Sequence, residues 1–211
     1  MSEKEKVLQQ INEIKSHLVD KELFFPYNFN ACHVWSLISI VLTLIMIPSY
    51  EQGIVVGTVV TFTFVLVGFV VEGILTKKVN ESYDIDDCTR RQQFIMKNFM
   101  MIALFAIVFS TVLASYKLYI PIFILWLFLI SLGHFAVGFV LNIKDYEKVA
   151  MFNIVMALIL SAVGVYFNLL EDRSTFLTLV QSVVIFGLAV LPSWVAFKQQ
   201  KLERKREACG V

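Results

Sequence analysis

Six stretches of apolar residues, each about as long as a lipid bilayer is thick, divide this chain of 211 residues. A helix needs about 20 apolar residues to cross a hydrocarbon core of ~30 Å. The segments are apolar on all sides instead of alternating with polar residues, which favours helices over barrel strands. The sequence therefore predicts an all-α integral membrane protein with six transmembrane helices in a compact bundle. The expected spans are about 31–48, 53–76, 98–116, 119–141, 149–169 and 174–197.

The overall composition excludes a soluble globular protein. Apolar residues make up 58% of the chain and charged residues only 17%. The mean hydropathy is +0.74. So few polar side chains cannot cover the surface of a globule in water.

The basic residues are distributed unevenly between the two sides that six spans define. All but two of the 18 lysines and arginines lie in the N-terminal segment, the second and fourth loops and the C-terminal tail. The exceptions are Lys117 and Arg173. Positive charge near the ends of spans is retained on the cytoplasmic side during insertion. We therefore expect a multi-pass protein of the cell inner (plasma) membrane with both termini in the cytoplasm.

Two cytoplasmic segments flank the expected transmembrane domain of residues 31–197. Residues 1–30 comprise a predicted amphipathic helix, over about residues 2–22, and a segment that re-enters the interface. Apolar side chains recur there every three or four residues, which is typical of a helix with one apolar face. Residues 198–211 form a basic tail that continues the last span. The apolar stripe of the N-terminal helix consists of Val7, Ile11, Ile14 and Leu18.

The stripe has two interpretations. The helix either lies against the membrane surface or the bundle, or it binds a cytoplasmic protein partner or a second copy of the chain, giving a homo-oligomer. The basic tail is expected to attract anionic lipid headgroups of the bilayer, as basic clusters beside a span do. Lipid binding explains its charge without a nucleic-acid partner. The residues expected to contact headgroups are Lys198, Lys201, Arg204, Lys205 and Arg206.

Three polar side chains interrupt the spans on the cytoplasmic half. Ionisable groups inside a bilayer are costly and usually face the interior of the bundle. Glu72 lies in the second span, His134 in the fourth and Asn153 near the start of the fifth. A glutamate and a histidine that face each other can share a proton, so these residues form a candidate intramembrane polar site.

A purely structural interpretation of the same residues is also open. Glu72 could reach the interface and pair with Lys77 or Lys78, which follow it by five and six residues. His134 could be a neutral side chain that bonds to a carbonyl of a neighbouring helix.

Small residues recur at equal spacing near the cytoplasmic ends of the even-numbered spans. Such residues let helices approach closely, and a proline can kink a span. We expect them to bring the even-numbered helices together, either as plain packing positions or as the mark of three hairpins in a parallel repeat. The expected packing residues are Gly68, Gly73, Gly133, Gly138, Gly187 and Pro192.

The function is less constrained than the fold. No serine or cysteine nucleophile can be placed beside His134, which favours a non-enzymatic protein. Metal sites need three or four ligands and the chain has three histidines, so we expect no metal and no cofactor. Because the charged features face the cytoplasm, the leading hypothesis is a regulatory, scaffold or accessory membrane component. The alternative is a small-solute or proton-coupled transporter, or its membrane subunit, with a polar site at Glu72, His134 and Asn153.

Overall fold

The structure, a computed structural model, describes residues 28–82, 90–171 and 175–208. The described chain is helical throughout, and six of its helical segments are long and apolar enough to cross a membrane. The protein is therefore a multi-pass helical bundle. The first five spans are α2 (Phe29–Gln52), α3 (Ile54–Ser82), α4 (Arg90–Ser115), α5 (Tyr119–Leu141) and α6 (Lys144–Tyr166). The sixth consists of α7 (Thr175–Ile185), a π-helical turn η1 (Phe186–Val190) and α8 (Leu191–Ala208).

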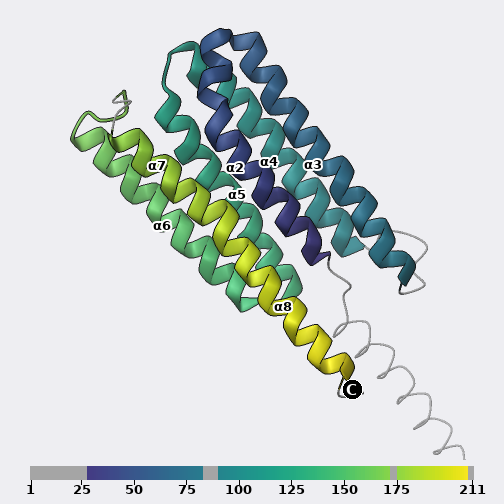
Figure 1. Cartoon of the computed structure of the whole chain (residues 1–211). Coiled ribbons are helices and arrows are strands. Elements are labelled where there is room, and N and C mark those ends of the chain that lie inside the picture. Colours follow the sequence, from purple (N-terminus) through teal and green to yellow (C-terminus); the bar gives the residue numbers. More distant parts are fainter. Residues whose placement is uncertain (1–27, 83–89, 172–174, 209–211) are drawn as a thin grey trace, which may run out of the picture.

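The helices lie side by side along one axis, and helices that are consecutive in the chain run in opposite directions (Figure 1). α2 packs on α3, α3 on α4, α4 on α5 and α5 on α6. The sixth span closes the bundle, because α8 and η1 pack on α2 while α7 packs on α5. The starts of α2, α4 and α6 and the end of α8 thus share one end of the molecule, here named the C-terminal end. The predicted N-terminal helix, with Val7, Ile11, Ile14 and Leu18, lies outside the described residues.

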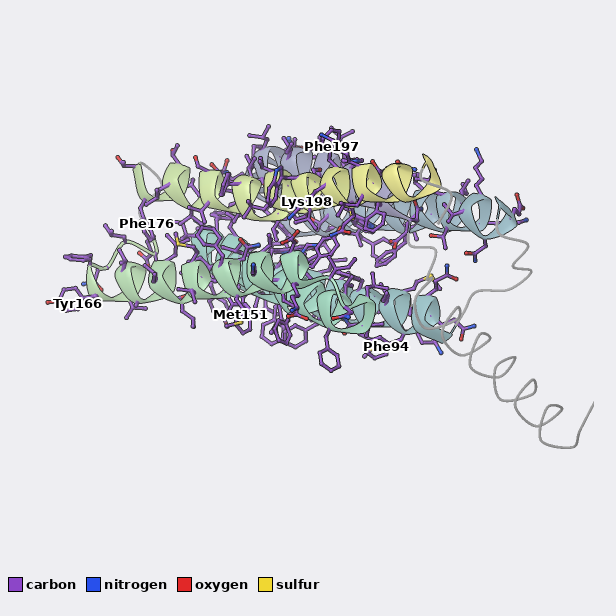
Figure 2. The ribbon with its side chains drawn as sticks, turned by 90° about the horizontal axis from the view of Figure 1, so that it is seen from below. Phe94, Met151, Tyr166, Phe176, Phe197 and Lys198 are labelled. Carbon is purple, nitrogen blue, oxygen red and sulfur yellow. The ribbon has the colours of Figure 1, made fainter. Side chains whose placement is uncertain are left out.

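Large apolar side chains cover the outside of the bundle. Val55 and Phe139 are 75% and 76% exposed, and Met151 and Phe197 project from the outer surface in Figure 2. In water such a surface would associate or aggregate. In a bilayer it faces hydrocarbon, which agrees with the six expected spans.

Three of the turns end in the same way. Lys117, Asn142 and Asn168 have φ values of 60°, 53° and 54°, the left-handed conformation that closes a helix. After each of them the next amide bonds back to the carbonyl five residues earlier, as in Ile143 N to Gly138 O at 2.8 Å. These turns are short, so consecutive helices are held as antiparallel pairs.

Two helices extend further than the apolar stretches predict. α3 continues to Ser82 instead of residue 76, and α4 begins at Arg90 instead of residue 98. The buried side chain of Asn80 exchanges two hydrogen bonds with Gln92, of 3.1 and 2.7 Å. This amide pair ties the polar extensions together. Hydropathy marks where a span leaves the hydrocarbon, but it does not mark where the helix ends.

The sixth span is irregular for a reason that lies in its sequence. Pro192 has no N–H, and its ring clashes with the carbonyl four residues earlier in a regular α-helix. The chain widens by one residue just before it, and the Leu191 amide bonds to Phe186 O instead of Gly187 O. The sequence predicts a kink at Pro192, and the structure has a π turn just before it. One consequence is that Gly187 O loses both helical donors, since position 192 has no amide hydrogen.

Side chains from α2 brace the same π turn. Ser36 Oγ lies 2.9 Å from Ala189 O and 2.7 Å from Cys32 O, and Ser193 Oγ donates to Ser36 Oγ over 2.7 Å. Since the Ser193 hydroxyl hydrogen is engaged, His33 Nδ1 serves as the donor in its 3.2 Å contact with Ser193 Oγ. This chain of hydrogen bonds fixes α2 against the sixth span.

Candidate functional site

A cavity of about 100 Å³ lies inside the bundle, between α2, α3, α4, α5 and the sixth span. Its α2 wall runs from Cys32 to Met46, which at 1.5 Å per residue is roughly 21 Å along the helix axis. The walls are mostly apolar. The ionisable side chains of the lining, Cys32, Glu72 and His134, lie toward the C-terminal end, whereas Ser39 and Thr43 line it further along α2. The cavity is therefore an elongated apolar space with its ionisable groups near one end.

Glu72 enters the cavity from α3 and is held by α2. Its Oε2 accepts a hydrogen bond of 2.8 Å from the indole Nε1 of Trp35. The Trp35 ring meets the Phe69 ring edge to face, with centroids 5.0 Å apart. Lys77 was, with Lys78, an expected partner of Glu72, but its Nζ lies 3.9 Å from Glu81 Oε1 instead. The carboxylate thus faces the interior of the bundle, and its bonded partner is a neutral N–H.

His134 enters the same cavity from α5. The imidazole lies between two rings, with Phe99 edge to face at 5.7 Å and Tyr146 stacked at 6.0 Å. Its Nδ1 atom is buried and has no hydrogen-bond partner. The expected bond to a neighbouring helix carbonyl is therefore not made through Nδ1. Packing, not hydrogen bonding, holds this side of the ring.

Glu72 and His134 share a cavity without touching each other. They come from α3 and α5, which are separated by α4 in the bundle, and no hydrogen bond or ion pair joins these two described side chains. Both side chains line a space that a third group can occupy. A small solute or water can fill that position.

Asn153 does not line this cavity. It is fully buried on α6, where its Nδ2 donates a hydrogen bond of 2.9 Å to Gly187 O. That carbonyl is the one orphaned by the π turn and Pro192. The expected three-residue site is therefore corrected to two residues, because the amide of Asn153 is used to satisfy a backbone group.

Coupling between Asn153 and Pro192 gives a test of this assignment. Asn153→Leu should cost about 1–3 kcal/mol, since it leaves a buried carbonyl without a donor. In a Pro192→Ala background the restored amide can serve the helix, and the cost should fall by about 1 kcal/mol or more. Unfolding in mixed micelles of the four proteins measures the cycle. Additive costs would contradict the assignment.

Two residues of this region carried no clear signal in the sequence. Cys32 Sγ and Tyr146 Oη lie 3.0 Å apart and both are buried. Tyr146 stands in the charged start of α6, beside Asp145 and Glu147, where the sequence indicates an interfacial residue. The short turn at Asn142 folds α6 back on α5 and brings Tyr146 against His134. Only the tertiary contact reveals it.

The glycines pack against neighbouring side chains and not against one another. A Cβ on Gly68 would stand 2.6 Å from the Trp35 ring, and one on Gly133 would stand 2.6 Å from the Phe99 ring. A Cβ on Gly138 would stand 2.8 Å from Glu147 Cγ. At these three glycines the expected approach of even-numbered helices is not found, since they receive side chains from odd-numbered spans. Gly187 in the sixth span does face Leu127 of the fourth, as well as Asn153 of the fifth. Gly73 has no packing role, because nothing lies within 4 Å of its Cβ position.

The start of the basic tail is partly engaged within the protein. Lys198 Nζ lies 2.6 Å from Asp145 Oδ2 and 5.5 Å from the Trp194 ring centroid. Gln200 donates to Asn30 Oδ1 over 2.9 Å. Lys201 is exposed. The side chains of Arg204, Lys205 and Arg206 lie outside the described part, so their expected contact with lipid headgroups stays a prediction.

Metal binding and similarity to known proteins add no further assignment. Within the described ranges, no three His, Cys, Asp or Glu side chains are grouped closely enough to hold a metal ion. No protein-family model, curated protein or solved structure matches this chain.

Proposed function

We propose that this protein is a small-solute transporter, or the membrane subunit of one, in which Glu72 and His134 form the polar part of the solute site. The observation that carries the proposal is that Glu72 and His134 line one interior cavity from different helices. Protein interiors are otherwise close-packed. A cavity of about 100 Å³ left empty would cost about 2 kcal/mol at ~24 cal/mol per Å³.

The irregular sixth span supports a moving part in this function. Its η1 turn contributes Leu188 to the cavity wall, and α8 contributes Pro192. π turns are frequent at functional sites, where they offer an alternative set of backbone bonds. A change in this turn would alter the cavity wall directly. We place the gating motion of the transporter here.

We also propose that the C-terminal end faces the cytoplasm of a cell whose plasma membrane holds the protein. The support is the distribution of basic residues, with Lys117 the lysine found at the opposite end in the described part of the chain. The hypothesis of a regulatory or scaffold component remains a prediction. That hypothesis depends on the apolar stripe of the N-terminal segment, which lies outside the described residues, whereas the cavity lies within them. The stripe consists of Val7, Ile11, Ile14 and Leu18.

Cysteine accessibility tests whether the cavity is a solute path. Ser39 lines the cavity on α2, while Leu37 on the same helix is 64% exposed toward lipid. In a background without the native cysteines, Ser39→Cys should react with a charged, membrane-impermeant methanethiosulfonate in reconstituted vesicles. The reagent reaches the thiol through water in the cavity. Mass spectrometry of the protein measures the labelled fraction.

The matched control is Leu37→Cys, which should stay unlabelled because hydrocarbon excludes the charged reagent. Labelling after addition to either side of the membrane would indicate alternating access. A Ser39→Cys protein as unreactive as Leu37→Cys would show a sealed interior and would reject the transport function.

A further inference from the structure

We propose that the solute bound in this cavity carries a small methylated ammonium group, which sits between Glu72 and the aromatic side chains of the lining. The inference rests on the proposed function, since it names the class of solute. Charge, ring placement and size each point to this class.

The charge of the lining is one-sided. Among the described residues that line the cavity, Glu72 is the one acid, and neither lysine nor arginine is present. The other titratable lining groups are Cys32 on α2 and His134 on α5. A carboxylate inside a membrane protein is costly unless a positive charge or a proton accompanies it. Glu72 can supply the negative charge of an ion pair, and the solute would supply the positive charge.

Aromatic rings line two walls of the cavity, and one of them contacts the carboxylate. Trp35, whose N–H bonds to Glu72, meets Phe69 at 5.0 Å on the α2–α3 wall. Phe99 meets His134 at 5.7 Å on the α4–α5 wall. Ring faces attract cations, and clusters of rings recognise quaternary ammonium groups in particular. Methyl groups on the nitrogen also suit the apolar walls, which offer few hydrogen-bond acceptors to an N–H.

The size of the cavity limits the group. A dry cavity of ~150 Å³ holds benzene, and this cavity measures about 100 Å³. Substituents larger than methyl on the nitrogen would therefore exceed the available space.

Tetramethylammonium is the probe, and the Trp35 indole is the reporter. Protein with ¹⁵N-labelled tryptophan is placed in nanodiscs and titrated with tetramethylammonium chloride at constant ionic strength set by sodium chloride. The Trp35 Nε1–H resonance, assigned by its loss in Trp35→Phe, should shift saturably because the cation approaches its hydrogen-bond acceptor. The Trp194 resonance should not shift, since Trp194 is an exposed residue of α8 outside the lining.

Two solutes of similar shape test the sign of the charge. Pivalate and tert-butanol replace the ammonium centre by an anionic and a neutral group. Neither should give a saturable shift. Pivalate that binds as tightly as tetramethylammonium would overturn the inference.

Substitution of the carboxylate tests the site. Glu72→Gln keeps an acceptor for Trp35 and removes the charge, and it should weaken tetramethylammonium binding at least tenfold. Glu81→Gln, on the same helix but paired with Lys77 at the surface, should leave the affinity unchanged. Unchanged binding in Glu72→Gln would overturn the inference. If Ser39→Cys is labelled but tetramethylammonium gives no saturable shift, the cavity serves a solute of another class and only this inference fails.

Discussion

Asn153→Asp should lower the free energy of unfolding by about 3–5 kcal/mol, the cost of a buried charge without a partner. The change replaces an amide nitrogen by a carboxylate oxygen at nearly constant volume. The new oxygen would stand where Nδ2 now lies 2.9 Å from Gly187 O, so two acceptors would face each other. Asn153 Oδ1 already lacks a hydrogen-bond partner and is buried. Neither oxygen of the aspartate would therefore have a donor.

The measurement is SDS-induced or thermal unfolding of the purified protein, followed by the tryptophan fluorescence. Asn168→Asp is the matched control, because Asn168 is exposed in a turn with φ 54° and aspartate tolerates that conformation. The control should lose less than about 0.5 kcal/mol. A loss below about 1 kcal/mol in Asn153→Asp would mean either that the carboxyl is protonated and itself donates to Gly187 O, or that another group satisfies this carbonyl.

Most of the fold could be predicted from hydropathy alone. Six apolar stretches of bilayer length allow few alternatives, since every backbone group in hydrocarbon must bond within its own helix. The ends of α3 and α4 could not be predicted in the same way. Residues 77–82 are polar enough to leave the membrane, yet they stay helical because Asn80 finds Gln92 on the next helix. That pairing depends on how two helices meet.

The candidate site was predicted in part. The cost of burying a charge placed Glu72 and His134 in the interior, and both line the cavity. The same argument included Asn153, although an amide can satisfy backbone as well as ligand. Its partner, Gly187 O, is left without donors by a proline five residues further along a different helix. No pattern in the sequence relates Asn153 to that carbonyl.

Glycine spacing was a weaker guide than charge. Equal intervals in three spans suggested one packing face, but the residues that fill the space over Gly68 and Gly133 are the rings of Trp35 and Phe99. A glycine in a span indicates only that some group of a neighbouring helix comes close to its backbone. The spacing cannot identify the approaching group, and at Gly73 there is none.

Gly187→Val should destabilise the bundle by about 1–3 kcal/mol, the usual cost of overfilling a packed interior. A Cβ at this position would stand 2.5 Å from Asn153 Oδ1 and 2.9 Å from Leu127 Cδ1. Asn153 cannot turn away without giving up its bond to Gly187 O, and Leu127 is fully buried. The strain therefore falls on the π turn itself. Unfolding in mixed micelles measures the loss.

Gly73→Val provides the comparison, because the same change at an open position on α3 adds a side chain that meets only lipid. We expect no loss of stability there, since glycine itself weakens a helix. Equal losses at the two positions would contradict the assignment of the cost to close contacts at Gly187. A loss confined to Gly187 would instead assign the cost to contact with Asn153 and Leu127. The π turn would then be a point where α5, α6 and the sixth span pack together. The Asn153 amide holds it, and it requires a glycine at position 187.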